Sequence, residues 1–262
     1  MKIAFFDSGL GGLSVLHRAM QMLPDEEFLF FADEDHVPYG LKTRAEIKNF
    51  VAEAFDFIVQ QGVKAIVVAC NTATSVAVRD MRQRYDVPII GMEPAAKLAL
   101  DRDPVHRVIV TATNVTVRGD KLHDLLVRYD QHHLIDLNPL QELVTFAERE
   151  EFTSPAVIDY LRGEFSKYDL SEYSAVVLGC THFNYFKDTM RALLPDHMQI
   201  LDGNEGTVRE LIRQLQAAGQ LAGPREGAVP PVDYYYSGRR VTDPAELARL
   251  GRFLKRLDEV DV

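Results

Sequence analysis

The chain has 262 residues, enough for one large domain or for two smaller ones that each bury a core. Hydrophobic residues make up 47% and charged residues 26% of it, a balance that is typical of a folded globular protein and excludes a largely disordered one. The 39 acidic and 29 basic residues give a formal net charge of -10, which excludes nucleic acid and anionic membrane surfaces as expected partners because no local basic patch offsets it.

The first part of the chain alternates short apolar runs with amphipathic segments. In "GGLSVLHRAMQML" and "LKTRAEIKNFVAEAFDFIVQQG" apolar residues recur three and four positions apart, which predicts helices, and Gly62 is expected to end the second helix. The remaining apolar and β-branched runs predict strands over residues 3–7, 28–32, 65–70 and 88–91. This order predicts a parallel sheet with crossover helices.

The second part of the chain repeats this scheme. Strands are predicted over residues 107–112, 134–137, 175–180 and 199–201, and helices over 121–129, 154–168 and 183–194. "KIAFFDSG" can be laid over "RVIVTATN", and "AIVVACNTA" over "AVVLGCTHF", at similar separations, which indicates an internal duplication. We therefore predict an α/β fold with two pseudo-symmetric, doubly wound lobes, each with a mostly parallel sheet, that face each other across an active-site cleft.

The C-terminal part is expected to return to the first lobe. A predicted helix over residues 207–218 is followed by the linker "GPREGAVPP", the strand-like run "VDYYYSG" and a final helix, "DPAELARLGRFLKRL", with Asp243 as its N-cap. The first lobe is thus predicted to comprise residues 1–96 and 208–262, and the second lobe residues 97–207.

No run approaches the roughly 18 apolar residues that cross a bilayer. Asp7 also interrupts the N-terminal apolar run before the core of a signal peptide could form. We therefore expect a cytoplasmic protein with no membrane partner.

The chain has two cysteines, and both stand at the ends of matching predicted strands. Cys70 is followed by "NTATS" and Cys180 by "THF", so each thiol precedes hydroxyl, amide or imidazole groups that suit a bound carboxylate. A thiolate acts as a base when its pKa falls below its usual value of about 8.5, and a helix N-terminus is expected to lower it. Two bases from opposite lobes predict proton removal on one face of a carbon and proton return on the other, which inverts a stereocentre.

The motif "DSGLGG" follows the first predicted strand and opens a helix. It lacks the Gly-Lys-Ser/Thr triplet of a Walker loop, and Asp7 would repel phosphate, whereas a carboxylate beside a hydroxyl suits an amino group. We therefore expect Asp7 and Ser8 to contact the ligand. The sequence shows no pyridoxal-lysine signature, dinucleotide loop or metal cluster, so the thiols are expected to act without a cofactor or a metal.

Ordered motifs along nearly the whole chain resemble those of the cofactor-independent aspartate/glutamate racemase superfamily. They are "DSGLGG", "VPYG", "ACNTAT", "PAAK", "TATNVT" and "GCTHF". The resemblance implies a two-lobed α/β enzyme without a cofactor that interconverts L- and D-glutamate, the D-form supplying peptidoglycan synthesis. It also suggests a homodimer.

The resemblance further implies roles for individual residues. Cys70 would be the base toward D-glutamate, assisted by Asp7. Cys180 would be the base toward L-glutamate, assisted by His182. The ligand would be held by residues of the same motifs, namely Ser8, Tyr39, Gly40, Asn71, Thr72, Thr113, Thr116 and Thr181.

The sequence departs from the family pattern in three places. Asn184 stands where relatives usually have proline after the "CTHF" motif, which is expected to alter the helix start without abolishing activity. Where many relatives have an "LVE" glutamate, "ELVTFAERE" has Thr145, with Glu142 and Glu148 nearby, so the acidic partner stays open. The segment "TVRGDK" also differs, without a functional interpretation.

Several alternatives remain open at the level of sequence. The cysteines could be small buried hydrophobic residues, a redox pair, or, with His182, ligands of a zinc ion. The substrate could be aspartate or another acidic amino acid, and the chain could be a ligand-binding or regulatory protein that kept the fold without catalysis.

Overall fold

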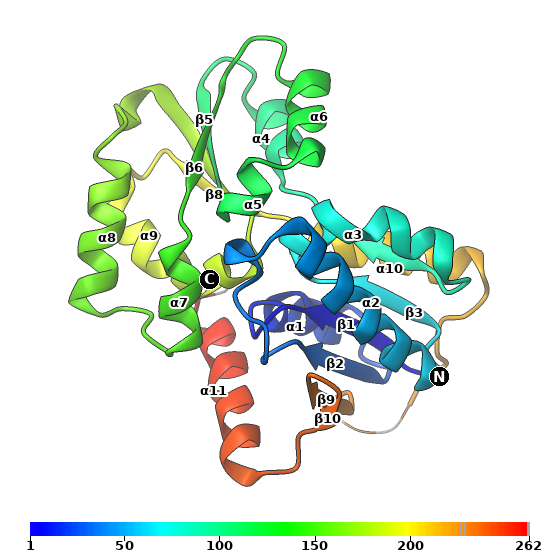
Figure 1. The fold of residues 1–262 in the computed structure, drawn as a ribbon. Helices are drawn as coiled ribbons and strands as arrows, with labels where there is room; N and C mark the ends of the chain where they lie inside the picture. The colour runs from blue at the N-terminus through cyan, green and yellow to red at the C-terminus, as the bar shows by residue number, and fades with distance from the viewer. Residues whose placement is uncertain (226, 228, 261–262) are drawn as a thin grey trace.

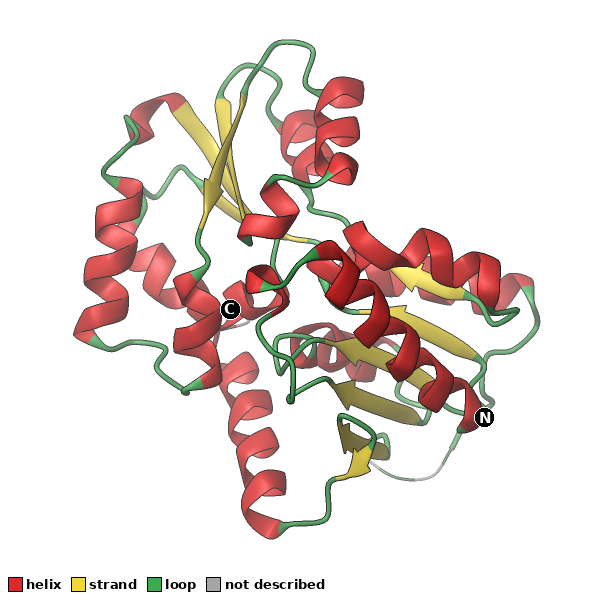
Figure 2. Ribbon diagram, viewed as in Figure 1, coloured by secondary structure: helices red, strands yellow, loops and turns green. Residues whose placement is uncertain are grey.

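The computed structural model describes residues 1–225, 227 and 229–260, and within them the chain forms two sheets flanked by helices (Figures 1 and 2). The strand order is β10-β9-β2-β1-β3-β4 in the first sheet and β6-β5-β7-β8 in the second. All pairings are parallel except that of β9 with β10. The predicted α/β class with two mostly parallel sheets is confirmed.

The first sheet is built from the two ends of the chain. Its strands are β1 (Ile3–Asp7), β2 (Phe28–Ala32), β3 (Ala65–Val68), β4 (Ile89–Gly91), β9 (Val232–Tyr236) and β10 (Arg239–Arg240). The accompanying helices are α1 (Leu13–Met22), α2 (Arg44–Gln60), α3 (Asn71–Arg84), α10 (Asn204–Ala217) and α11 (Pro244–Val260), with the short 3-10 helix η1 (Tyr39–Leu41) before α2. The expected linker before β9 includes residues 226 and 228, which lie outside the described residues.

The second sheet is built from the middle of the chain. Its strands are β5 (Arg107–Ala112), β6 (Ile135–Pro139), β7 (Tyr173–Leu178) and β8 (Gln199–Asp202). The helices around it are α4 (Ala96–Arg102), α5 (Asn114–Val117), α6 (Asp120–Tyr129), α7 (Glu142–Glu148), α8 (Pro155–Phe165) and α9 (Lys187–Leu193), with the 3-10 helices η2 (Leu170–Glu172) and η3 (Thr181–Phe186). The lobe boundaries at residues 96/97 and 207/208 stay predictions.

Local signals account for several element ends. Thr43 and Glu46 form a capping box at the start of α2, and Gly62 follows its C-cap with φ of 68°, a conformation that glycine adopts without strain. Asp243 accepts hydrogen bonds from the backbone N–H groups of Ala245 and Glu246 at the start of α11, as an N-cap does.

The helix predicted over residues 183–194 is wrong in its first part. The segment begins as η3 and becomes α-helical only at Lys187. All six residues of η3 are buried, so no alternation of apolar and polar faces marks where the regular helix starts.

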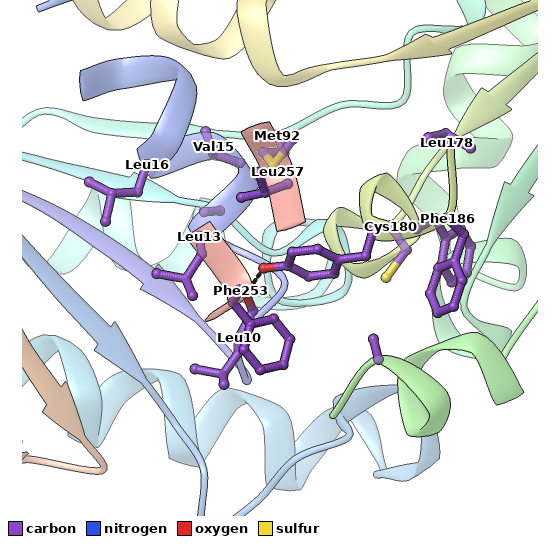
Figure 3. Close-up of a cluster of buried hydrophobic side chains, with 14 of the residues drawn as sticks. Leu10, Leu13, Val15, Leu16, Met92, Leu178, Cys180, Phe186, Phe253 and Leu257 are labelled. Atoms are coloured by element: carbon purple, nitrogen blue, oxygen red, sulfur yellow. Dashed lines mark hydrogen bonds between the residues drawn. The ribbon is translucent and has the colours of Figure 1, made fainter. Parts of the chain in front are cut away.

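One apolar cluster joins the two sheets. It contains Phe5 of β1, Leu178 of β7 and Phe253 of α11, and α11 packs against both α1 and η3. Figure 3 shows Cys180 and Phe186, which follow β7, in the same cluster as Leu10 and Phe253. The C-terminal helix therefore contacts the segment that carries Cys180.

Candidate active site

Both cysteines directly follow the carboxyl end of a central strand. Cys70 lies two residues beyond β3 and is the N-cap of α3, and Cys180 lies two residues beyond β7 and precedes η3. They come from different sheets, yet they line one small cavity. Its lining is completed by Asp7, Ser8, Pro38, Tyr39, Gly40, Asn71, Thr72, Thr113, Val144, Thr181 and His182. The structure thus gathers all the expected site residues except Thr116, and adds Pro38 and Val144.

The cavity has a volume of about 10 Å³. This is about the space that one water molecule needs. The cavity in this structure is therefore too small to hold an amino acid.

The Cys70 thiol is buried beside the carboxyl group of Asp7. Its sulfur accepts from the backbone N–H of Ala73 at 3.4 Å and lies 3.7 Å from the Ser8 hydroxyl. Burial raises the pKa of Cys70 well above its usual value, and the charge of Asp7 adds to this, while the Ala73 and Ser8 contacts oppose it. The N–H group at the start of α3 lowers this pKa as expected, but the loss of hydration outweighs that single donor, so the expected net lowering is wrong.

Asp7 ends β1 beside Cys70 and is fully buried. Its Oδ2 accepts from the backbone N–H of Gly12 at 2.7 Å, whereas its Oδ1 has no hydrogen-bond partner among the described residues. Burial raises the pKa of Asp7, and the nearby charge of His182 only partly offsets this. A carboxyl group in this state can hold a proton and release it to a neighbouring group.

His182 links Cys180 to a carboxylate. Its Nδ1 lies 3.8 Å from the Cys180 sulfur, and its Nε2 lies 2.6 Å from Oε1 of Glu148. The backbone nitrogen of Gly11 is also 3.2 Å from Nε2, but Nε2 cannot accept from Gly11 while it donates to Glu148, so the shorter contact decides its role. Although burial alone would lower it, the contacts with Cys180 and Glu148 raise the pKa of His182 well above its usual value. The imidazolium can therefore donate through both nitrogens.

Glu148, the last residue of α7, is the acidic group that the sequence left unresolved. Its Oε1 also accepts from the backbone N–H of Leu10 at 2.8 Å. Burial acts to raise the pKa of Glu148, but the hydrogen bond and charge of His182, the Leu10 N–H and Arg249 hold it below its usual value. Thr145 and Glu142, the other candidates on α7, are exposed. The only signal in the sequence was an acidic residue one helical turn after Thr145.

Three threonine hydroxyls connect the two sheets near the cavity. Thr72 on α3 lies 2.8 Å from Thr113 and 3.3 Å from Thr116, and the last two are 3.0 Å apart. Thr113 also caps α5 by accepting from the backbone N–H of Thr116. Thr72 and Thr113 line the cavity, whereas Thr116 does not.

The loop before α2 forms another wall. The Tyr39 hydroxyl donates to Oδ2 of Asp33 at 2.6 Å, and Asp33 also accepts from the Ser237 hydroxyl at 2.9 Å. The hydroxyl of Tyr39 is thus already engaged by a buried carboxylate that the sequence did not single out. A Cβ at position 40 would overlap the side-chain amide of Gln141, which would have to move to make room.

Two asparagines, Asn184 and Asn71, follow the two cysteines in the chain. Asn184 donates to the backbone oxygen of Thr181 at 3.0 Å, so it holds the start of η3 where relatives usually have proline. Asn71, which follows Cys70, is buried, and its Oδ1 has no hydrogen-bond partner in the described part of the chain.

Among the described residues, no three His, Cys, Asp or Glu side chains are grouped so that they could hold a metal ion. No described helix is long and apolar enough to span a membrane.

Comparisons with known proteins agree with this arrangement. Residues 12–211 match the model of the Asp/Glu/hydantoin racemase family. A glutamate racemase of Campylobacter curvus is 50% identical over 99% of this chain and 98% of its own length. A glutamate racemase of Lachnospira eligens is 45% identical over 99% of both chains.

Solved structures give the same result for the fold. A glutamate racemase from Thermus thermophilus, in complex with beta-chloro-D-alanine, is 32% identical with a TM-score of 0.76, covering 97% of this chain and 92% of its own. The Escherichia coli glutamate racemase, in complex with L-glutamate and the activator UDP-MurNAc-Ala, is 28% identical with a TM-score of 0.81, covering 96% and 95%.

Proposed function

Because the chain belongs to the Asp/Glu/hydantoin racemase family, we propose that it interconverts L- and D-glutamate by proton transfer between two cysteine thiols. It is an amino-acid racemase, an isomerase, like its curated relatives, one of which is identical to it at 50% of the aligned residues. The observation that carries the two-thiol mechanism is that Cys70 and Cys180, from two different sheets, line one cavity.

In this mechanism one sulfur takes the α-proton and the other returns a proton to the opposite face. With L-glutamate bound, the Cys180 thiolate removes the α-proton, and the electron pair left on the α-carbon is delocalised into the adjacent carboxyl group. The Cys70 thiol then donates its proton to the other face, which gives D-glutamate, a Cys180 thiol and a Cys70 thiolate. The reaction from D-glutamate runs through the same steps in reverse.

The neighbours of each sulfur suit these roles. On the Cys180 side, the His182 imidazolium can stabilise negative charge on the sulfur, and Glu148 holds the imidazole in place. On the Cys70 side, the buried Asp7 can accept a proton as the thiol forms its thiolate and return it later. These groups would reset the protonation of the thiols between turnovers.

The remaining polar residues of the cavity would hold the substrate. Asn71, whose Oδ1 is unpartnered among described residues, can accept from the substrate ammonium, and the backbone N–H groups at the start of α3 suit a carboxylate. The Tyr39 hydroxyl donates its proton to Asp33, so it would contribute to binding as an acceptor, for example from the substrate ammonium. The closed cavity would exclude water from the carbanion.

We also propose that the D-glutamate feeds peptidoglycan synthesis in the cytoplasm, where the two cysteines stay reduced. The homodimer stays a prediction, and light scattering at several protein concentrations would test it.

The decisive test follows the purified protein with L- and D-glutamate by circular dichroism and monitors α-proton exchange in deuterated water. We expect racemisation in both directions and exchange at the α-carbon. Binding of glutamate without α-proton exchange would favour a non-catalytic binding protein. Faster turnover of aspartate than of glutamate would identify aspartate as the preferred substrate. Thiol titration before and after mild oxidation tests the redox alternative, which predicts the loss of both thiols together.

A further inference from the structure

Arg249 reaches the active site from the C-terminal helix. It lies on α11, about one hundred residues from Glu148 in the sequence, and its side chain is largely buried. Its Nη2 donates to Oε2 of Glu148 at 3.1 Å and to the backbone oxygen of the same residue at 3.0 Å. Figure 1 shows α11 next to α7, the helix that Glu148 ends.

The two oxygens of Glu148 therefore serve different partners. Oε1 accepts from His182 and Leu10, while Oε2 accepts from Arg249. A carboxylate held at both oxygens cannot rotate away from the imidazole. The second bond to the carbonyl oxygen also fixes the last residue of α7, where the negative end of the helix dipole favours a cation.

A second carboxylate, Glu34, contacts the other terminal nitrogen of Arg249. Nη1 of Arg249 lies 3.2 Å from Oε2 of Glu34, in the loop after β2. Burial disfavours the charged guanidinium, but Glu34 and Glu148 outweigh this and keep the pKa of Arg249 above its usual value. The chain of contacts runs from Glu34 through Arg249, Glu148 and His182 to the Cys180 sulfur.

We propose that Arg249 is a positioning residue for the Cys180 half of the reaction, held in place by Glu34. Arg249 acts through Glu148 and His182 and does not touch the substrate. This proposal rests on the proposed racemase function. It assigns part of the active site to the C-terminal helix.

The proposed reaction has two proton-transfer steps, one at each sulfur, and each step has its own energy barrier. Loss of Arg249 should raise only the barrier at Cys180. The enantiomers have equal free energies in water, so kcat/KM must fall equally in both directions, and rates alone cannot identify the affected barrier. Isotope effects can identify the affected barrier. The deuterium of α-deuterated L-glutamate is removed by Cys180, whereas the deuterium of α-deuterated D-glutamate is removed by Cys70.

The experiment compares Arg249→Gln with the wild-type enzyme, using α-deuterated L- and D-glutamate. We expect kcat/KM to fall at least about tenfold, as loss of one charge-assisted hydrogen bond predicts. The isotope effect on kcat/KM should rise for L-glutamate and fall for D-glutamate. A general structural defect would lower the rate and leave the ratio of the two effects unchanged.

Arg252→Gln is the matched control. Arg252 lies on the same helix and pairs with Glu150 at 2.6 Å, two residues after Glu148, but is exposed. Its loss should change neither the rate nor the ratio. Arg249→Lys keeps the positive charge but lacks the two-pronged guanidinium. It should shift the ratio of the two isotope effects in the same direction as Arg249→Gln, but by less. If Arg249→Gln does not fold, Arg249→Lys provides the test.

An unchanged ratio in a folded, slower Arg249 variant would overturn the proposal, as would equal effects of Arg249→Gln and Arg252→Gln. A wild-type protein that fails to racemise glutamate would instead overturn the proposed function. The two failures are therefore distinct.

Discussion

The imidazole of His182 and the carboxylate of Glu148 are in direct contact, with 2.6 Å between Nε2 and Oε1. This contact raises the pKa of His182 and holds the ring so that Nδ1 faces Cys180. The acid-base properties of the Cys180 side thus depend on a residue from another helix.

Glu148→Gln should lower activity and shift its pH dependence. Without the carboxylate the pKa of His182 falls, so the imidazolium loses its proton at lower pH. We expect kcat/KM to fall at least about 10- to 100-fold, because Glu148 both orients the imidazole and keeps it protonated. The alkaline limb of the pH profile should move to lower pH, as measured by initial rates in both directions.

Glu142→Gln provides the control for this variant. Glu142 lies in the first turn of the same helix and is exposed. It should leave both the rate and the alkaline limb as in the wild type. Equal pH profiles for Glu148→Gln and the wild type would show that Glu148 does not set the protonation of His182.

Removal of either sulfur should stop racemisation. Cys70→Ala and Cys180→Ala each lack one of the two groups that exchange a proton with the α-carbon. Cys→Ser at either position should leave a trace at most, because a hydroxyl is far less acidic than a thiol at neutral pH. Circular dichroism follows the loss, and calorimetric binding of glutamate checks that the site persists. Full turnover in either alanine variant would refute the two-thiol mechanism.

Glu34 should make the protein less stable as the pH rises. Burial and the charge of Glu148 raise the pKa of Glu34 to about 7. Arg249 and His182 act in the opposite direction and offset only part of this rise. The phenol group of Tyr236 also lies near Glu34. The unfolded chain ionises this group near its usual value, so the folded state loses stability between about pH 4.5 and 7. Glu34→Gln does not titrate and should avoid this loss.

The measurement is the free energy of unfolding in urea at pH 5 and pH 8. The free energy of unfolding of Glu34→Gln minus that of the wild type should be greater at pH 8 than at pH 5, by on the order of 1 to 3 kcal/mol. Glu150→Gln is the control, because hydrogen bonds from Arg252 lower the pKa of Glu150 and keep it ionised throughout this range. A pH-independent difference for Glu34→Gln would mean that Glu34 ionises normally in the folded state.

Gly11→Ala should displace His182. A Cβ at position 11 would lie 2.6 Å from the backbone nitrogen of His182 and would also overlap its ring. Since backbone cannot yield as a flexible side chain does, we expect activity to fall by about two orders of magnitude or more, the usual effect of a misplacement near 1 Å. Initial rates and thermal unfolding would measure the two consequences.

Gly163→Ala tests whether any added methyl group has this effect. Gly163 lies inside α8, and a Cβ there would meet no heavy atom of the described residues within 4 Å. We expect unchanged activity and a gain of about 0.5–1 kcal/mol in stability, because alanine favours the helix. Wild-type activity in Gly11→Ala would contradict the geometry of the Gly11–His182 contact.

The sequence alone determined the α/β class, the positions of the main strands and the two cysteines at strand ends. These features depend on local patterns: β-branched runs between amphipathic segments, and small polar residues where strands end. The motif "DSGLGG" predicted Asp7 and Ser8 as ligand contacts, and the family resemblance assigned Asp7 to Cys70. The motif order added the family and the ligand-binding residues.

Only the tertiary structure decided which acidic residue serves His182, why the pKa of Cys70 is high, and how α11 takes part. Glu148, Arg249 and Glu34 come from three separate elements, and their contact depends on how the helices pack, which no local pattern encodes. Burial likewise arises from the whole fold, and at Cys70 it outweighs the helix N-terminus. Electrostatics in the site and the meeting of the two sulfurs in one cavity are therefore properties of the packed molecule, while the position of each cysteine at a strand end follows from the sequence.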